Sequence, residues 1–293
     1  MKKRYTLTLW LSLAVLAAII LSAVLARWLA PMDPTEIHLE EALQGSSARH
    51  WLGTDQTGRD IFSRLLSGGR TTLFGALSVV LFAMAIGIPL GLFAGYYGGW
   101  FDRIVRSVCD VIIAFPSLLL AFVLVAAFGR NLSNSILAIG IIYIPMTARL
   151  TRSLTLTEKS KTYVEAARAL GYSGPRILFT EILPNCMTAL TAQLTLDFGY
   201  AILDLAAMSF IGLGVQPPTP DWGAMLEEGQ ALLFSHPWIA LSPGILIAVT
   251  VVAVNLFSDG VMQCLDTRHH GLPRTRRRRM RELCRRAEAT KTK

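Results

Sequence analysis

TTLFGALSVVLFAMAIGIPLGLFAGYYGGWF, residues 71–101, carries no charged side chain. About 20 apolar residues are enough to cross the roughly 30 Å of hydrocarbon in a bilayer. The stretch therefore predicts a membrane-spanning helix at about 73–96. Only helices and closed β-barrels can cross lipid, and barrel strands show an alternation that this continuous run lacks. The sequence thus predicts an all-α polytopic membrane protein.

The composition of the whole chain supports this class. Of its 293 residues, 53% are hydrophobic and 16% are charged, whereas a soluble domain has about 25% charged residues. The mean hydropathy is +0.47. These values exclude disordered, collagen-like and disulfide-stapled proteins. The four cysteines have no metal-binding spacing, and we interpret them as ordinary residues.

Five further apolar runs raise the predicted number of membrane-spanning helices to six. They are 7–29, 111–129, 131–148, 187–213 (interrupted by Asp197 and Asp204) and 238–258. The first run is longer than the core of a usual signal peptide, so we interpret it as an uncleaved anchor. The short connection around Gly129 predicts that the third and fourth helices form an antiparallel hairpin. Gly87, Gly91 and Gly95 in the second helix are expected to allow close helix packing and not to form a hinge.

The distribution of basic residues predicts that both termini are cytoplasmic. With the N-terminus inside, the predicted cytoplasmic segments carry 22 Lys and Arg residues and the opposite segments carry 5. Basic residues concentrate on the cytoplasmic side of membrane proteins. The tail 268–293 alone has 11 of them. A basic tail can bind nucleic acid, but beside a membrane span it favours topology and anionic headgroups, so we expect no nucleic-acid partner.

The runs and loops divide the chain into four parts. These are a cytoplasmic N-terminus with the first membrane helix (1–30), an extracytoplasmic loop (31–69), a core transmembrane domain (70–262) and a basic cytoplasmic tail (263–293). The core domain contains a long cytoplasmic loop, 151–186. In the outer loop, residues 60–66 alternate charged and apolar side chains at helical spacing, which predicts a short amphipathic helix that leads into the second membrane helix.

The inner loop has a helix–Gly–helix pattern. Residues 161–170 are good helix formers with three alanines, which give a small, flat surface. Gly171 is expected to end this helix in the left-handed conformation. Residues 173–175 predict a turn, and a second helix is expected from residue 176 to Pro184. Such a pair beneath the bilayer either docks a cytoplasmic partner or lies at the interface without one, and its shape does not decide between these.

Short motifs in this loop resemble the EAA loop of ABC-importer permeases. They are Glu165-Ala166-Ala167, Gly171 and Leu183-Pro184 at the family spacing. Glu181 departs from the pattern, since it stands where the family has an apolar residue. Four other stretches resemble the peptide/nickel branch, in its second (C-type) permease. They are Leu52-Gly53-Thr54-Asp55 with Gly58-Arg59-Asp60; Phe115-Pro116-Ser117; 209–214 with Pro217-Pro218 and Asp221-Trp222-Gly223; and Asn255-Leu256-Phe257 with Asp259-Gly260.

The resemblance, which covers about residues 10–266, implies a type I ABC-importer (MetI-like) permease fold with six membrane helices in the bacterial inner membrane. It implies pairing with a homologous second permease, two ATP-binding subunits docked beneath, and an extracytoplasmic solute-binding protein. The solute would be a small peptide, nickel or another metal chelate, and the sequence does not choose between them. By the same resemblance, the ATPase-coupling loop consists of Glu165, Ala166, Ala167, Gly171, Leu183 and Pro184.

The chain itself is expected to have no catalytic residue, metal or cofactor. No GxxxxGK[ST] motif is present, so ATP and magnesium are expected in the partner ATPase subunits. An integral membrane enzyme is one alternative, but HExxH and GxSxG motifs are absent from the sequence. An autonomous channel or secondary transporter is another, although it would not need a docking helix pair. His38, His50 and His236 lack metal-binding spacing, and we interpret them as ordinary loop residues.

Asp197 and Asp204 are candidate residues of a translocation pathway. They are seven positions apart and so share one helix face. A charge at the centre of a membrane helix costs about 2.5–3.5 kcal/mol on insertion scales, so both should face the protein interior. There they would favour a cation such as a peptide amino terminus or a divalent metal, or would simply pair with a neighbouring helix. The outer segment 214–237, with its acidic residues Asp221, Glu227 and Glu228, is expected to be solvated or to meet a binding protein.

Overall fold

The computed structural model describes residues 2–265, and within this part the chain is helical apart from loops and one isolated bridge between Thr54 and Asp60. The helices are α1 (Lys2–Val24), α2 (Ala26–Leu29), the 3-10 helix η1 (Leu39–Glu41), α3 (Ile61–Tyr97), α4 (Gly99–Ala114), α5 (Ser117–Phe128), α6 (Leu132–Lys159), α7 (Thr162–Ala169), α8 (Gly174–Arg176), the π-helix η2 (Ile177–Ile182), α9 (Leu183–Phe210), α10 (Trp222–Gln230) and α11 (Trp238–Leu265). The basic tail lies outside the described residues from position 266 onward.

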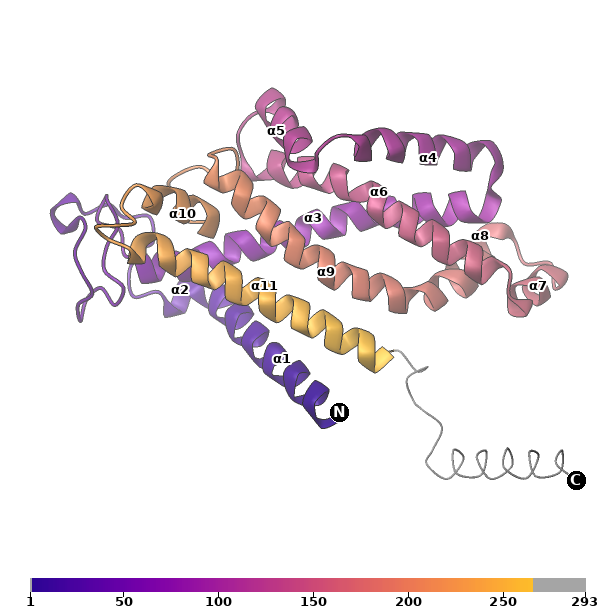
Figure 1. The fold of residues 1–293 in the computed structure, drawn as a ribbon, viewed down its shortest axis with the longest axis horizontal. Coiled ribbons are helices and arrows are strands. Elements are labelled where there is room, and N and C mark those ends of the chain that lie inside the picture. The colour runs from indigo at the N-terminus through magenta and orange to yellow at the C-terminus, as the bar shows by residue number, and fades with distance from the viewer. Residues whose placement is uncertain (1, 266–293) are drawn as a thin grey trace, which may run out of the picture.

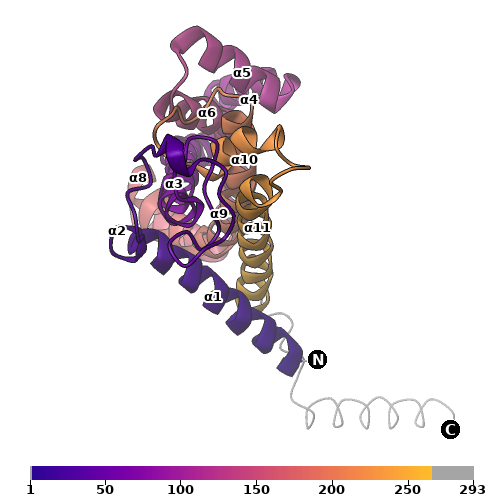
Figure 2. The same ribbon diagram turned by 90° about the vertical axis from the view of Figure 1, so that its left-hand side faces the viewer.

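Four long helices form the body of the molecule. α3, α6, α9 and α11 run along its long axis, with α3 packed on α6 and α9, and α9 packed on α11 (Figure 1). The loop 31–60 and α10 gather at one end, which we call the loop end. The short helices α7 and α8 lie at the other end, which we call the α7 end. α1 runs obliquely across the bundle beside α11 and α3 (Figure 2).

The packing of α3 on α6 depends on the glycines predicted to allow it. A Cβ atom on Gly91 would lie 2.5 Å from the carbonyl oxygen of Ala148. Cβ atoms on Gly87 and Gly95 would each lie 2.8 Å from a threonine Cβ atom of α6. These distances are too short for any larger side chain, so the glycines are what bring the two backbones together. The interpretation as packing residues is confirmed.

Length and composition identify fewer membrane-spanning helices than the six predicted. Among the described residues, three helices are long and apolar enough to cross a membrane: α3, α6 and the helix Pro237–Met262, which corresponds to most of α11. The count becomes four if α4 and α5 cross together as a bent pair. α1 is a shorter apolar helix by this measure (Thr8–Val24), and α9 does not meet it. The all-α, multi-pass architecture is confirmed, and the number six stays a prediction.

Two helix boundaries differ from those predicted. The run 111–129 is not one straight helix, because α4 ends before Pro116 and α5 continues at an angle of 90°. Proline disfavours the helical conformation in the residue before it, and Phe115 is extended, with φ −88° and ψ 142°. The helix predicted to end at Pro184 continues instead, since Pro184 lies in the first turn of α9. Ile182 and Leu183 before it both have right-handed helical backbone angles, so η2 runs directly into α9.

Candidate functional site

The predicted coupling helix is α7, which follows α6 after two residues. Its C-terminus has the predicted geometry: Gly171 has φ +78°, and the N–H of Tyr172 donates to the carbonyl of Ala167 at 3.1 Å. A Cβ atom on Gly171 would meet nothing within 4 Å. Glycine is therefore favoured here by the left-handed backbone alone and not by lack of space.

Three contacts fix α7 to the ends of α6 and α3. Glu158, in the last turn of α6, accepts a hydrogen bond from the hydroxyl of Tyr163 at 2.7 Å and pairs with the ammonium of Lys161 at 2.6 Å. The guanidinium of Arg168 lies 5.2 Å from the centre of the Tyr96 ring in α3, a cation–π distance. Through these contacts α7 is tied to both long helices.

The two faces of α7 differ in character. Val164 and Ala167 are buried against Ile177, Leu178 and Ile182 of η2 in the hydrophobic core of the α7 end. Glu165 and Ala166 are exposed, so the EAA motif has two members on the surface and one, Ala167, in the core. Burial of Ala167 explains why a small residue is needed there as well.

Leu170 also belongs to the exposed face, although it is not among the residues predicted from the sequence. Its side chain is 74% exposed, directly before Gly171. Leu170 therefore extends the exposed face of α7 by one large apolar side chain. Leu170 could have been identified from the sequence, because it is a large apolar residue immediately before Gly171, the glycine that ends the helix.

Leu183 and Pro184 lie apart from this exposed face, at the start of α9. Leu183 is half-buried against the core of the α7 end, and Pro184 is exposed. Glu181 is half-buried in η2, while the neighbouring Ile182 is fully buried. The apolar character that the motif places at position 181 is therefore supplied here by Ile182.

Asp197 and Asp204 both lie on α9 and both are half-buried. The hydroxyl of Tyr143 in α6 donates to Asp204 at 2.7 Å, and the amide of Gln193 donates to Asp197 at 2.8 Å. Each carboxylate thus has a hydrogen-bond partner, as expected if it pairs with neighbouring groups. Tyr200, which lies between them on α9, is 57% exposed. The face that carries the two carboxylates is therefore partly open.

A cluster of buried charges lies at the loop end, and it was not predicted from the sequence. Asp55 accepts a hydrogen bond from Arg59 at 2.7 Å and also pairs with Arg64. Glu228 of α10 accepts from Arg59 at 2.9 Å and from Arg64 at 2.6 Å. The side chains of Arg59 and Arg64 are only 8% and 2% exposed. Burial acts to raise the pKa of Asp55, but the guanidiniums of Arg64 and Arg59 outweigh it and lower that pKa.

Asp221 and Trp222 join α10 to α3 beside this cluster. Asp221 caps α10 by accepting from the N–H groups of Gly223 and Ala224, and it also accepts from the hydroxyl of Thr72 at 2.6 Å. Burial raises the pKa of Asp221. The expectation that Asp221 and Glu228 belong to a solvated acidic surface is wrong, because the first is buried and the second is paired. Of the three acidic residues only Glu227 is exposed.

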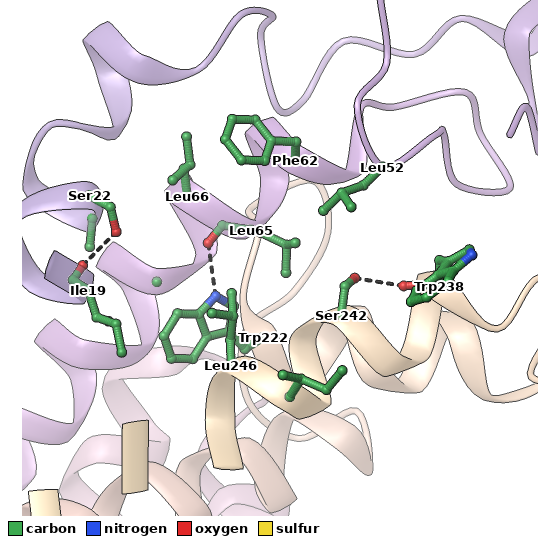
Figure 3. Close-up of a pocket in the computed structure, with 13 residues that line it drawn as sticks. Ile19, Ser22, Leu52, Phe62, Leu65, Leu66, Trp222, Trp238, Ser242 and Leu246 are labelled. Carbon is green, nitrogen blue, oxygen red and sulfur yellow. Dashed lines mark hydrogen bonds between the residues drawn. The ribbon is translucent and has the colours of Figure 1, made fainter. Parts of the chain in front are cut away.

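Trp222 forms one wall of an apolar pocket of about 350 Å³ between α1, α3 and α11 (Figure 3). Its indole N–H donates to the carbonyl of Leu65 at 2.9 Å. A Cβ atom on Gly69 would lie 2.8 Å from the indole ring, so α3 needs a glycine where the ring lies against it. The Asp-Trp-Gly motif therefore serves packing at the loop end.

His50 is also buried at the loop end. Its Nδ1 atom lies 3.0 Å from Asp60, and its Nε2 atom lies 3.4 Å from a carboxylate oxygen of Glu41. Each ring nitrogen of His50 thus lies near a carboxylate. Within residues 2–265, no group of three or more His, Cys, Asp or Glu side chains is arranged to hold a metal ion.

Comparison with known proteins gives a family whose members are membrane transport components, which agrees with the helical, multi-pass architecture. Residues 87–270 match the family described as binding-protein-dependent transport system inner membrane component. The chain belongs to this family. It is the permease subunit of an ABC importer, a multi-pass protein of the inner membrane whose family works with ATPase and binding-protein partners.

Relatives of this permease match most of its length. The dipeptide transport system permease protein DppC of Alkalihalophilus pseudofirmus is 41% identical over 254 residues, which cover 87% of this chain and 84% of that protein. The glutathione transport system permease protein GsiD of Pectobacterium atrosepticum is 44% identical over 242 residues, which cover 82% of this chain and 80% of that protein. GsiD of an Escherichia coli O6:K15:H31 strain is 42% identical.

A solved structure confirms the MetI-like fold of the permease. The inward-facing MetNI methionine ABC transporter contains a chain that superposes with a TM-score of 0.58 at 18% identity. The match covers 70% of the permease described here and 97% of that chain. At this identity the likeness concerns the fold alone.

Proposed function

We propose that this permease forms half of an ATP-driven import pathway and that α7 is the element on which a separate ATPase subunit acts. The observation that carries the proposal is the exposed face of α7. Glu165, Ala166 and Leu170 point away from the core, while the helix is held to α3 and α6 by Tyr96 and Glu158. Small side chains allow a partner to approach closely, and ATP-driven closure of that partner would bias an inward–outward equilibrium.

The proposed assembly has two homologous permeases, two ATP-binding subunits that hold ATP and magnesium, and an extracytoplasmic binding protein. In it, the α7 end and both termini are cytoplasmic, the loop 31–69 is extracytoplasmic, and the core domain is 70–262. This chain contributes the coupling loop 151–186, with Glu165, Ala166, Ala167 and Gly171 in α7, and Leu183 and Pro184 at the start of α9. The absence of a GxxxxGK[ST] motif supports hydrolysis in another subunit.

We further propose small peptides as the solute class. The relatives named above transport a dipeptide or glutathione according to their names, and both solutes are short peptides. Asp197 and Asp204 are the acidic side chains proposed to favour the amino terminus of such a solute on the partly open face of α9. The alternative of nickel or a metal chelate is kept as an arm of the test.

Ala166→Gln tests the coupling proposal, with Thr180→Gln as the matched control. Both residues are exposed, but only Ala166 lies on α7. Each tagged variant is expressed in its native strain, and the purified complex is assayed for ATP-hydrolysing subunits. We expect Ala166→Gln to lose these subunits while the permease still inserts, and Thr180→Gln to retain them. If both variants retain the subunits and hydrolyse ATP in step with transport, α7 is not the docking element.

Reconstitution in liposomes tests the function and the solute together. The wild-type complex, with its binding protein, is given dipeptides, glutathione or Ni²⁺, and uptake is measured with and without ATP. We expect ATP-dependent uptake of peptides only. Uptake by the permease alone, without ATP, would instead support an autonomous channel or secondary transporter. Uptake of Ni²⁺ alone would overturn the peptide assignment and leave the coupling proposal intact.

A further inference from the structure

A cleft of about 930 Å³ opens at the loop end, between α2, the chain that follows it and α3. It is separate from the apolar pocket beside Trp222, because the two share no lining residue. It is also separate from Asp197, Asp204 and α7, none of which contributes to its walls. Its lining combines positive charge with apolar surface, so the cleft fits an amphipathic ligand.

The charge in the cleft comes from two arginines. Arg27 of α2 and Arg70 of α3 both line the cleft and are exposed. Neither forms an ion pair with any residue of the part of the chain that the structure describes. Among the lining residues Asp33 is the single carboxylate, and it accepts hydrogen bonds from the hydroxyl of Thr35 at 2.6 Å and its N–H at 2.8 Å. The cleft therefore carries a net positive charge.

Both arginines lie where an apolar segment meets water. Arg27 follows the apolar part of α1, and Arg70 directly precedes the uncharged stretch 71–101. The neighbouring Trp28 is 76% exposed, and tryptophan is enriched at the level of lipid headgroups. α2 packs on α3, and both arginines line the same cleft.

The wall of the cleft on the membrane side is apolar. Phe74, one turn beyond Arg70 in α3, lines the cleft and is 66% exposed. Leu132, at the start of α6, also lines it. A ligand that places an anion on the arginines would therefore place the group attached to it along Phe74 and Leu132. A phospholipid has this arrangement, because its anionic phosphate group is attached to hydrocarbon chains.

We propose that this cleft binds an anionic phospholipid at the membrane boundary of the loop end. The phosphate lies between Arg27 and Arg70, whose guanidiniums donate charge-assisted hydrogen bonds to its oxygens. An acyl chain lies along Phe74 and Leu132. A lipid with a net negative charge is preferred to a zwitterionic one, because a choline group brings a positive charge to a cleft that is already positive. The lipid joins α2 to α3 across their contact.

Native mass spectrometry of the delipidated complex tests this proposal. The complex is titrated with phosphatidylglycerol or with phosphatidylcholine of the same acyl chains. The double variant Arg27→Gln/Arg70→Gln is compared with the wild type, with Arg27→Lys/Arg70→Lys, which keeps the charge, and with Arg103→Gln. Arg103 is an exposed arginine of α4 outside the cleft, so its variant measures the general effect of removing a positive charge.

We expect the wild type, the lysine variant and Arg103→Gln to bind phosphatidylglycerol more tightly than phosphatidylcholine. The glutamine double variant is expected to bind phosphatidylglycerol about 30-fold more weakly, since each basic side chain near an anionic lipid contributes a factor of about five. Equal binding of the two lipids by the wild type would overturn the proposal. Phosphatidylglycerol binding that is unchanged in the glutamine double variant would also overturn it. This holds even if that variant has lost the stimulation of ATP hydrolysis by the binding protein.

Discussion

Glu228 of α10 forms ion pairs with Arg59 and Arg64 at the loop end. The side chains of Arg59 and Arg64 are buried and Glu228 contacts both, whereas its neighbour Glu227 is exposed. Removing one partner of a buried ion pair leaves the other charge uncompensated, which costs about 3 kcal/mol. Glu227 and Glu228 therefore form a matched pair in which the same chemical change has different consequences.

We expect Glu228→Gln to lower the free energy of unfolding of the loop end by about 3 kcal/mol, and Glu227→Gln to change it by less than about 0.5 kcal/mol. Hydrogen exchange of the purified complex measures this locally, with residues 53–64 and α10 as the reporting segments. Equal exchange rates in the two variants would show that the ion pairs of Glu228 do not stabilise this end.

Asp55 gives the loop end a pH dependence of known sign. Its pKa is lowered in the folded protein, so its ion pairs contribute stability above the pKa of the unfolded chain, about 3.9. That contribution falls as the pH drops through the lower folded pKa. We expect the protection of residues 53–60 against hydrogen exchange, corrected for the intrinsic pH dependence of amide exchange, to fall below about pH 4 in the wild type. In Asp55→Asn the acid-dependent part should be smaller, and an identical pH profile in the two proteins would contradict the assignment.

At the scale of single elements, α7 depends on the backbone of Gly171. Its φ of +78° is costly for any residue with a Cβ atom, by about 1 kcal/mol for alanine, while asparagine tolerates it better. We expect Gly171→Ala to displace the end of α7 and to lower the amount of solute transported per ATP hydrolysed. Gly171→Asn should retain most of this coupling.

The comparison of these two variants separates backbone conformation from side-chain size. A Cβ atom at position 171 meets nothing within 4 Å, so crowding inside the permease is the same, and negligible, for both. The measurement is the ratio of transport to ATP hydrolysis in reconstituted complexes. Equal losses in Gly171→Ala and Gly171→Asn would indicate that the partner, and not the left-handed backbone, requires glycine at this position.

The elements that the sequence predicted well are those with local signals. Each of these predictions depended on residues that are close together in the sequence. Examples are the uncharged stretch 71–101, the alanines of α7 and the glycine that follows them. Prolines were harder to interpret, because their effect depends on place. Pro116 follows an extended residue and separates α4 from α5, whereas Pro184 lies in the first turn of α9 and is compatible with the helix.

The loop-end cluster was beyond sequence reasoning for a physical reason. Arg64 and Glu228 are 164 positions apart, and their contact exists only because α10 folds back on the start of α3. A single sequence shows that both residues are charged but not that they meet. The same limit applies to Asp204, whose hydrogen bond to Tyr143 joins α9 to α6 across 61 positions. Spacing placed Asp197 and Asp204 on one face, and it also places Gln193 one turn from Asp197, but only the fold brings Tyr143 to Asp204.

At the scale of the whole molecule, the two ends differ in how they are built. The loop end contains ion pairs that join Glu228 of α10 to the buried side chains of Arg59, before α3, and Arg64, in the first turn of α3. The α7 end carries a short helix with an exposed leucine, fixed to the long helices by Tyr96 and Glu158. The proposed function, in which solute arrives at the loop end and an ATPase subunit acts on α7, requires the two ends to lie on opposite sides of the membrane.

Cysteine labelling in intact cells tests this placement. Gly45 at the loop end and Ser173 at the α7 end are both exposed, and a side chain added at Gly45 would meet nothing within 4 Å. A membrane-impermeant maleimide should label Gly45→Cys in intact cells with a permeable outer envelope, and should label Ser173→Cys only after the inner membrane is opened. Cys109 and Cys186 are buried, and the wild type serves as the background. If Ser173→Cys is labelled in intact cells and Gly45→Cys is not, the orientation is the opposite of the proposed one. A cytoplasmic ATPase could then not contact α7.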